Sequence, residues 1–179
     1  KTIGKLAADM EVSSEQALLN IIENGGSEIL VFDECLDPAG VTELVNHPLG
    51  FIASDGAGFA INDNAQRDKL VHPRCFGTAP RFLHRTIAEN LIPLSEAIRK
   101  LTNAPAMALG ISGRGLVKSG NYADLVLINP DKIQDRATAI NPYQFSEGIE
   151  AVWVNGKIAG RNSRPVTSDL FGRFIRKNV

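Results

Sequence analysis

The sequence predicts an α/β protein in which a parallel sheet is followed by a β-rich segment. Three observations lead to this prediction. Helical and strand-like patterns alternate through residues 13–56, short helical patterns continue to Gly110, and strand patterns with tight turns follow Gly113. A strand, a helix and a second strand joined by short loops form a βαβ crossover, which belongs in a parallel sheet. We therefore expect a division into residues 1–112 and 113–179.

The composition is that of a soluble globular protein. The 179 residues are 44% hydrophobic and 22% charged, with a formal net charge of -1. Near-neutral charge argues against a nucleic-acid surface, which needs clustered positive charge. No apolar run reaches the length that spans a bilayer. Cys35 and Cys75 match no zinc-binding or redox spacing. We expect both cysteines to be free thiols in a reducing compartment, which predicts a cytoplasmic protein. From the charge and the apolar runs we expect binding to neither nucleic acid nor membranes.

The first helix and strand of the α/β part have clear boundary signals. Ser13 and Gln16 fit a capping box, in which each side chain bonds the other residue's backbone N–H. Apolar residues follow at helical spacing, and Gly25 ends the helix. Residues 27–32 are a continuous apolar run, which predicts a strand buried on both faces.

A second helix and strand follow. Asp37 is a suitable cap, Pro38 suits the first helical turn, and His47 marks the end of the helix. Residues 49–54 then form a short apolar run before Asp55, which predicts a buried strand that ends at a turn.

Asp55 is the first candidate functional residue. It lies where the predicted strand ends, and in parallel α/β proteins this rim carries the chemistry, because the strand fixes the residue and the loop leaves it open to substrate. The alternative is an ordinary turn in which Asp55 bonds its own backbone before Gly56, since Asp-Gly is a common turn dipeptide.

The middle of the chain combines a long loop with helices. Residues 54–80 are polar and rich in Gly, Asn and Pro, and a connection this long predicts a functional loop. The helical patterns that follow cover residues 81–89, 94–101 and 105–110, and Ala97, Ile98 and Leu101 are expected to face inward.

The last third of the chain is predicted to be β-rich. Leu116-Val117 and residues 123–128 read as short strands separated by a turn. Residues 151–154 and 157–159 flank Asn155-Gly156, a dipeptide that suits the type I′ turn of a tight hairpin.

Several short blocks combine chemically useful residues in a distinctive order. They are Ser54-Asp55-Gly56, His72-Pro73-Arg74, Gly77-Thr78-x-Pro80-Arg81, Asp135-Arg136-Ala137-Thr138, Gly148-Ile149-Glu150 and Val154-Asn155-Gly156. In order and spacing the blocks resemble the amidohydrolase superfamily and, more closely, its N-acyl-D-amino-acid deacylases, also called D-aminoacylases. The resemblance extends over nearly the whole chain but matches only the carboxyl-terminal part of such an enzyme.

The resemblance implies the carboxyl-terminal part of a (β/α)8 TIM barrel, containing its last strands, followed by β-sandwich strands. Residues 27–32 would be the seventh barrel strand, and Asp55 would follow the eighth. The missing amino-terminal portion, or another chain, would then complete the barrel and supply most metal ligands.

The resemblance also implies a mechanism. A zinc ion would activate water. Asp55 would be the catalytic base and a metal ligand, and the reaction would hydrolyse an N-acyl-D-amino acid to a carboxylate and a free D-amino acid. Arg74 is the candidate for binding the substrate's carboxylate, because a guanidinium holds a carboxylate with two hydrogen bonds. His72 is a candidate for orienting substrate. In the alternative, Arg74 ties the loop to a carbonyl and His72 bonds the backbone.

Two other functions remain open at this point. The chain can belong to another amidohydrolase, of the dihydroorotase or cyclic-amidase kind, although the two blocks that begin at His72 and Asp135 argue against this. It can also be a catalytically inert fragment. We expect the chain alone to be inactive.

Overall fold

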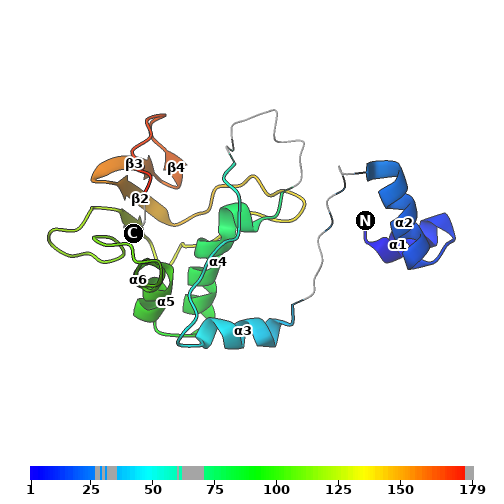
Figure 1. Cartoon of the computed structure of the whole chain (residues 1–179), viewed down its shortest axis with the longest axis horizontal. Helices are drawn as coiled ribbons and strands as arrows, with labels where there is room; N and C mark the ends of the chain where they lie inside the picture. Colours follow the sequence, from blue (N-terminus) through cyan, green and yellow to red (C-terminus); the bar gives the residue numbers. More distant parts are fainter. Residues whose placement is uncertain (27–28, 30, 32–35, 60, 62–70, 176–179) are drawn as a thin grey trace. The chain divides into compact units, whose positions relative to one another are not determined.

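The computed structural model describes residues 1–26, 29, 31, 36–59, 61 and 71–175. The chain divides into two units, Lys1–Glu34 and Cys35–Val179. It is a mixed α/β structure, with its helices in the first two thirds and an antiparallel sheet near the end (Figure 1).

The smaller unit consists of two helices, α1 (Ile3–Met10) and α2 (Ser14–Gly25). The capping of α2 is confirmed in part. The Ser13 hydroxyl accepts a hydrogen bond from the Gln16 backbone N–H, but the Gln16 side chain bonds Asn20 instead of returning to the cap.

Helix α1 was not predicted, although its sequence carries a start signal. The Thr2 hydroxyl accepts a hydrogen bond from the Lys5 N–H, as an N-cap residue does. The strand predicted at residues 27–32 lies mostly outside the described residues. Its two described members, Ile29 and Val31, are not in a strand.

Helix α3 (Pro38–Asn46) begins as predicted. An Asp37 carboxylate oxygen accepts the Gly40 N–H at 2.8 Å, and Pro38 occupies the first turn. The helix ends at His47, whose extended backbone matches the predicted stop.

The strand predicted at residues 49–54 is not formed. A strand needs backbone hydrogen bonds to a neighbouring strand, and here they go to His47 and to the helical residue Lys100 instead. The backbone oxygen of Lys100 accepts the Ile52 N–H at 3.1 Å. The buried Lys100 ammonium donates to the carbonyls of His47 at 2.5 Å and Gly50 at 2.8 Å. The segment is therefore irregular, and Leu49 is 84% exposed.

Helix α4 (Arg74–Glu89) begins two turns before the predicted start at Arg81. The prediction was wrong because residues 74–80 were assigned to the long polar loop, whereas Pro80 lies inside the helix. Pro80 has no N–H, so the carbonyl of Phe76, four residues earlier, loses its helical partner. The Ser146 hydroxyl, which lies across from the helix, donates to this carbonyl at 3.3 Å. This bond from outside the helix compensates for the missing one.

Helix α5 (Leu94–Leu101) has the predicted bounds, and helix α6 (Asn103–Ala108) begins two residues before the predicted Pro105. The prediction of which residues of α5 face inward was partly wrong. Ala97 is buried and Leu101 packs against the core, but Ile98 is exposed. The buried position next to Leu101 belongs to Lys100, whose ammonium is satisfied by the two carbonyls that follow α3.

The sheet has four antiparallel strands in the order β1-β2-β3-β4. The strands are β1 (Leu125–Ile128), β2 (Ile149–Val154), β3 (Lys157–Arg161) and β4 (Arg164–Pro165). Asn155 and Gly156 both have positive φ angles, 50° and 80°, which confirms the predicted hairpin turn. Leu116-Val117 is not a strand, and Val117 is 89% exposed. Loops make up most of the segment after Gly113.

The core of the larger unit joins the helices to one end of the sheet. Phe82 and Leu83 of α4, Ala97 of α5 and Ile133 form a buried cluster, and the partly buried residues Val45, Ile52, Ile128 and Ile149 pack against it. The predicted boundary at 112/113 stays a prediction. None of the helices among the described residues is both long and apolar enough to cross a bilayer.

Gly148 makes the closest backbone contact with this core, so replacing it with alanine should be strongly destabilising. Its φ is +76°, and a methyl group there would lie 2.5 Å from Ile133 Cα. Gly120 is a matched control, because its φ is +87° and the space around it is open. We expect Gly148→Ala to lower the free energy of unfolding by about 1–3 kcal/mol more than Gly120→Ala, from overpacking alone. Denaturant unfolding of the full-length variants measures this difference, and equal losses would contradict the packing described.

Candidate active site

Asp55 lies in a turn that abuts the beginning of α4. Its φ is 48°, in the left-handed region, and the Ser54 hydroxyl accepts a hydrogen bond from the Gly56 N–H at 3.2 Å. A side chain on Gly56 would lie 2.9 Å from Cys75 Cα, so only glycine allows this approach. The chain turns here, but the bond comes from Ser54, whereas the turn alternative had the Asp55 side chain bonding its own backbone. The Asp55 side chain remains 88% exposed and open to a partner.

Arg74, the first residue of α4, lies beside Asp55. Its guanidinium is 3.3 Å from an Asp55 carboxylate oxygen. The Arg74 side chain is 45% exposed, and ion pairs between exposed groups contribute about 1 kcal/mol or less. Another carboxylate can therefore take the place of Asp55 on Arg74 at little cost. The structure brings these two predicted site residues together from positions 19 apart in the sequence.

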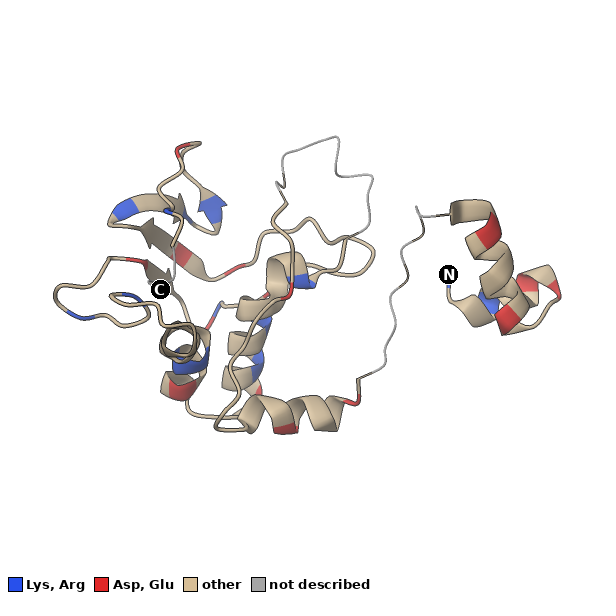
Figure 2. Ribbon diagram, in the orientation of Figure 1, with Lys and Arg blue, Asp and Glu red and all other residues tan. Residues whose placement is uncertain are grey.

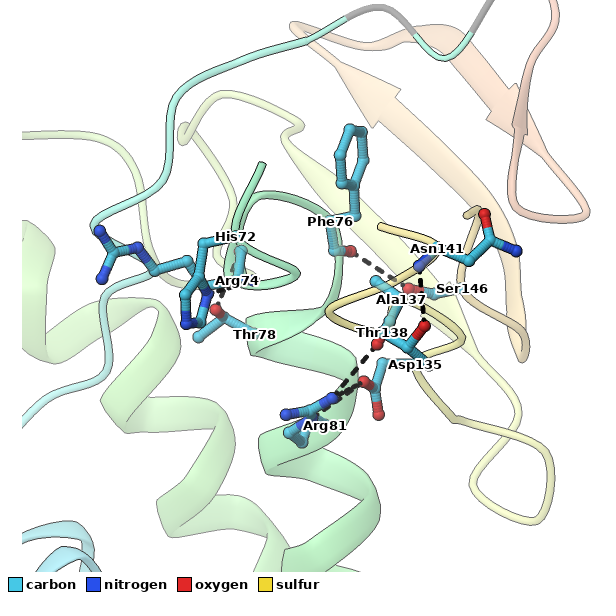
Figure 3. Close-up of polar contacts among 10 residues, drawn as sticks. All are labelled: His72, Arg74, Phe76, Thr78, Arg81, Asp135, Ala137, Thr138, Asn141 and Ser146. Atoms are coloured by element: carbon cyan, nitrogen blue, oxygen red, sulfur yellow. Dashed lines mark hydrogen bonds and ion pairs between the residues drawn. The ribbon is translucent and has the colours of Figure 1, made fainter. Parts of the chain in front are cut away.

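His72 precedes α4 and bonds its backbone. Its Nδ1 accepts the Arg74 N–H at 3.0 Å, which satisfies one of the helix's first free donors (Figure 3). This contact is the backbone role given above as the alternative for His72. Partial burial and then the positive charges of Arg74 and Arg81 lower the pKa of His72 below its ordinary 6.5. The neutral imidazole, which can accept this bond, is therefore favoured at neutral pH.

This contact predicts a pH dependence of stability. Because the folded-state pKa of His72 is lowered, the unfolded state binds more protons between that pKa and 6.5. Stability should therefore be lost as the pH falls from 6.5 through the lowered value. His72→Asn keeps an acceptor but does not titrate. Thermal unfolding at pH 5.5 and 7.5 should show a larger loss on acidification for the wild type than for this variant. Equal losses would mean that protonation of His72 does not weaken the start of α4.

Two of the sequence blocks interlock beside this site. An Asp135 oxygen accepts hydrogen bonds from Arg81 Nε at 2.9 Å and from an Arg81 terminal nitrogen at 2.6 Å (Figure 3). The same terminal nitrogen also donates to the Ala137 carbonyl at 3.3 Å. Sequence reasoning assigned no site role to either charged residue. Their opposite charges in two distinctive blocks were the only signal available.

The cavity at the start of α4 is small. Its volume is about 200 Å³, and its lining combines His72, Arg74 and Arg81 with apolar residues of α3, among others. Sites for small molecules usually have volumes of about 300–1,000 Å³. Asp55 is not among the lining residues. Figure 2 shows that α4 carries basic residues along its length, and Arg85 there pairs with Glu89.

A zinc site is not complete within this part of the molecule. Among the described residues, no group of three or more His, Cys, Asp or Glu side chains lies close enough to hold a metal ion. Zinc sites take three or four protein ligands. Asp55 offers a single exposed carboxylate, so these residues do not form a zinc site by themselves.

A model of the family described as "Amidohydrolase family" matches residues 55–159, beginning at Asp55 and ending in β3. The chain belongs to this family. The chain is also similar to N-acyl-D-amino-acid deacylases. The N-acyl-D-aspartate deacylase of Alcaligenes xylosoxydans xylosoxydans is 35% identical over 158 residues, covering 88% of this chain and 29% of the relative. The D-aminoacylase of the same organism is 36% identical over 137 residues, which cover 75% of this chain and 28% of that relative.

A solved amidohydrolase also has a similar fold. The N-acyl-D-glutamate deacylase of Bordetella bronchiseptica, crystallised with zinc and a phosphonate inhibitor, is 27% identical with a TM-score of 0.70. The match covers 92% of this chain and 33% of that one. The chain therefore spans about a third of the length of this relative.

Proposed function

We propose that this chain is the carboxyl-terminal portion of a zinc-dependent N-acyl-D-amino-acid deacylase. The contact between Asp55 and Arg74 is the observation that carries the proposal. In an N-acyl-amino acid, only three bonds separate the carboxylate carbon from the amide carbon that is attacked. A base and a carboxylate-binding cation must therefore lie close together, and this is how Asp55 and Arg74 lie.

In the proposed reaction, substrate displaces the Asp55 carboxylate from Arg74. The substrate's carboxylate then takes up the guanidinium, and Asp55 is free to accept a proton from water as the water's oxygen attacks the amide carbon. The C–N bond breaks as Asp55 returns the proton to the leaving nitrogen. The products are a carboxylic acid and a free D-amino acid. When bound, zinc would supply the polarisation that makes water a good nucleophile near neutral pH.

The proposed architecture is the end of a TIM barrel followed by β-sandwich strands. Large apolar side chains exposed on the described residues support it, among them Leu44, Leu49 and Val117, since missing neighbours would cover such side chains. β1 lies at an edge of the sheet, where a further strand can pair. We propose that the rest of the protein, or another chain, covers these surfaces and supplies the remaining metal ligands. The cytoplasmic location stays a prediction.

Substrate preference tests the proposed function. Full-length protein with zinc is assayed on N-acetyl derivatives of acidic and neutral D-amino acids, and on cyclic amides such as dihydroorotate and hydantoin. We expect hydrolysis of the linear amides and no measurable opening of the rings. The opposite preference would favour the cyclic-amidase alternative, and inactivity on both classes would favour an inert protein.

The chain of residues 1–179 alone should not retain zinc after dialysis. Asp55 is one ligand, and a stable zinc site takes three or four. The full-length protein is the control and should keep its metal under the same conditions. Elemental analysis of both samples measures the zinc content. One zinc ion per isolated chain would contradict the prediction, because it would mean that this chain supplies a complete set of zinc ligands.

A further inference from the structure

The first turns of α4 carry Arg74 and lack one backbone hydrogen bond of the helix. The His72 ring accepts the Arg74 N–H at the helix start, but Pro80 has no N–H to donate to the Phe76 carbonyl. Contacts from another part of the chain therefore add support to these turns. They come from Asp135 and Ser146, which lie on the segment between β1 and β2 (Figure 3).

Asp135 makes two kinds of contact with α4. Its side chain is 12% exposed, and its carboxylate accepts two hydrogen bonds from Arg81. Its Cβ fits against the bare backbone of Gly77, where a methyl group would lie 2.9 Å from it. One contact lies about one turn after Arg74 and the other about two turns after it. A shift of Asp135 would therefore move the part of α4 that determines where Arg74 lies.

The carboxylate of Asp135 is not arranged for catalysis itself. One oxygen is bound by both donating nitrogens of Arg81, and the side chain is largely buried. Asp55, by contrast, is 88% exposed. The two acids are thus suited to different tasks, one to contact substrate and the other to hold the helix.

We propose that Asp135 is a positioning residue for substrate binding, which acts through Gly77 and Arg81 to fix Arg74 for the substrate's carboxylate. The inference rests on the proposed function and names a further residue that this function needs. The geometric requirement is strict, because a displacement of about 1 Å in a reacting assembly can cost roughly a hundredfold in rate.

The test uses Asp135→Asn in the full-length protein. The measured quantity is a selectivity ratio, defined as kcat/KM for an N-acetyl-D-amino acid divided by kcat/KM for the same compound with its carboxylate converted to an amide. We expect the ratio to fall about tenfold. This is less than the roughly hundredfold loss that a displacement of about 1 Å can cause, because the substitution should shift Arg74 by a smaller distance. A merely structural role would lower the amount of active enzyme and leave the ratio unchanged.

A matched control lies on the same helix. Glu89 pairs with Arg85 at 2.9 Å near the far end of α4. Glu89→Gln also removes an ion pair from this helix but should leave the selectivity ratio unchanged. Ser146→Ala is a second test if Asp135→Asn folds poorly. It removes only the hydrogen bond to Phe76, and the ratio should fall by about two- to tenfold.

Arg74→Met separates the two levels of the proposal. If it lowers the ratio while Asp135→Asn and Ser146→Ala do not, Arg74 binds the carboxylate and the positioning role of Asp135 is wrong. If Arg74→Met leaves the ratio unchanged, the proposed role of Arg74 fails, and the positioning role fails with it. A lower ratio in all three variants, with Glu89→Gln unchanged, supports the inference.

Discussion

Asp55→Asn in the full-length protein should lower kcat by at least about 10²–10⁴-fold, the usual contribution of general acid–base catalysis. The amide keeps the shape of the side chain but cannot accept the water's proton. The residue is 88% exposed and lies in a turn that Gly56 holds against α4, so the substitution should leave the fold intact. Steady-state hydrolysis of an N-acetyl-D-amino acid measures the effect.

Asp169→Asn is the control for this experiment. Asp169 is also exposed, and its backbone N–H donates to the Thr167 hydroxyl. Its substitution should leave kcat within about twofold, since surface changes away from the site have small effects. Zinc content is measured in both variants. Near-normal kcat in Asp55→Asn with zinc still bound would remove Asp55 from the mechanism.

Arg74→Met should lower kcat/KM for N-acetyl-D-amino acids by roughly ten- to a hundredfold, which corresponds to about 1.5–3 kcal/mol for hydrogen bonds to a charged group. The loss should fall mainly on KM, because the carboxylate is bound alike in the ground state and the transition state. The substrate amide, which lacks the carboxylate, should be affected far less.

Arg99→Met is the control for Arg74→Met. It removes a guanidinium from α5 that is paired with Glu96 and is not among the residues lining the cavity at the start of α4. KM should be unchanged in this variant. Equal effects of the two substitutions would mean that Arg74 acts through the overall charge of the protein and not by direct contact with substrate.

Local signals predicted the helices well where caps and apolar spacing agree. Asp37 with Pro38 gave the start of α3, and the bounds of α5 were correct. The start of α4 was missed because its stabilising contact is remote. Nothing near Pro80 in the sequence shows that Ser146 donates a hydrogen bond to Phe76.

Residues 49–54 failed as a strand for a related reason. An apolar run favours a buried strand, but strand pairing depends on which backbone lies next to the run, and residues 49–54 stay partly or fully exposed. Here the buried Lys100 provides the hydrogen bonds through its ammonium and its carbonyl. No local pattern predicts a buried lysine in this position.

The candidate site was predictable in its residue types but not in its geometry. The blocks containing Asp55 and Arg74 were visible in the sequence, whereas their 3.3 Å separation required the fold. The role of Asp135 was hidden for the same reason, because its partner Arg81 lies 54 positions earlier.

The chirality of the released product tests the central claim most directly. Full-length protein with zinc is incubated with racemic N-acetyl amino acid, and the free amino acid is resolved by chiral chromatography while acetate is measured in parallel. The account predicts release of the D-amino acid with one acetate per amino acid and an untouched L-substrate. Release of the L-amino acid, or no hydrolysis of either enantiomer, would contradict it.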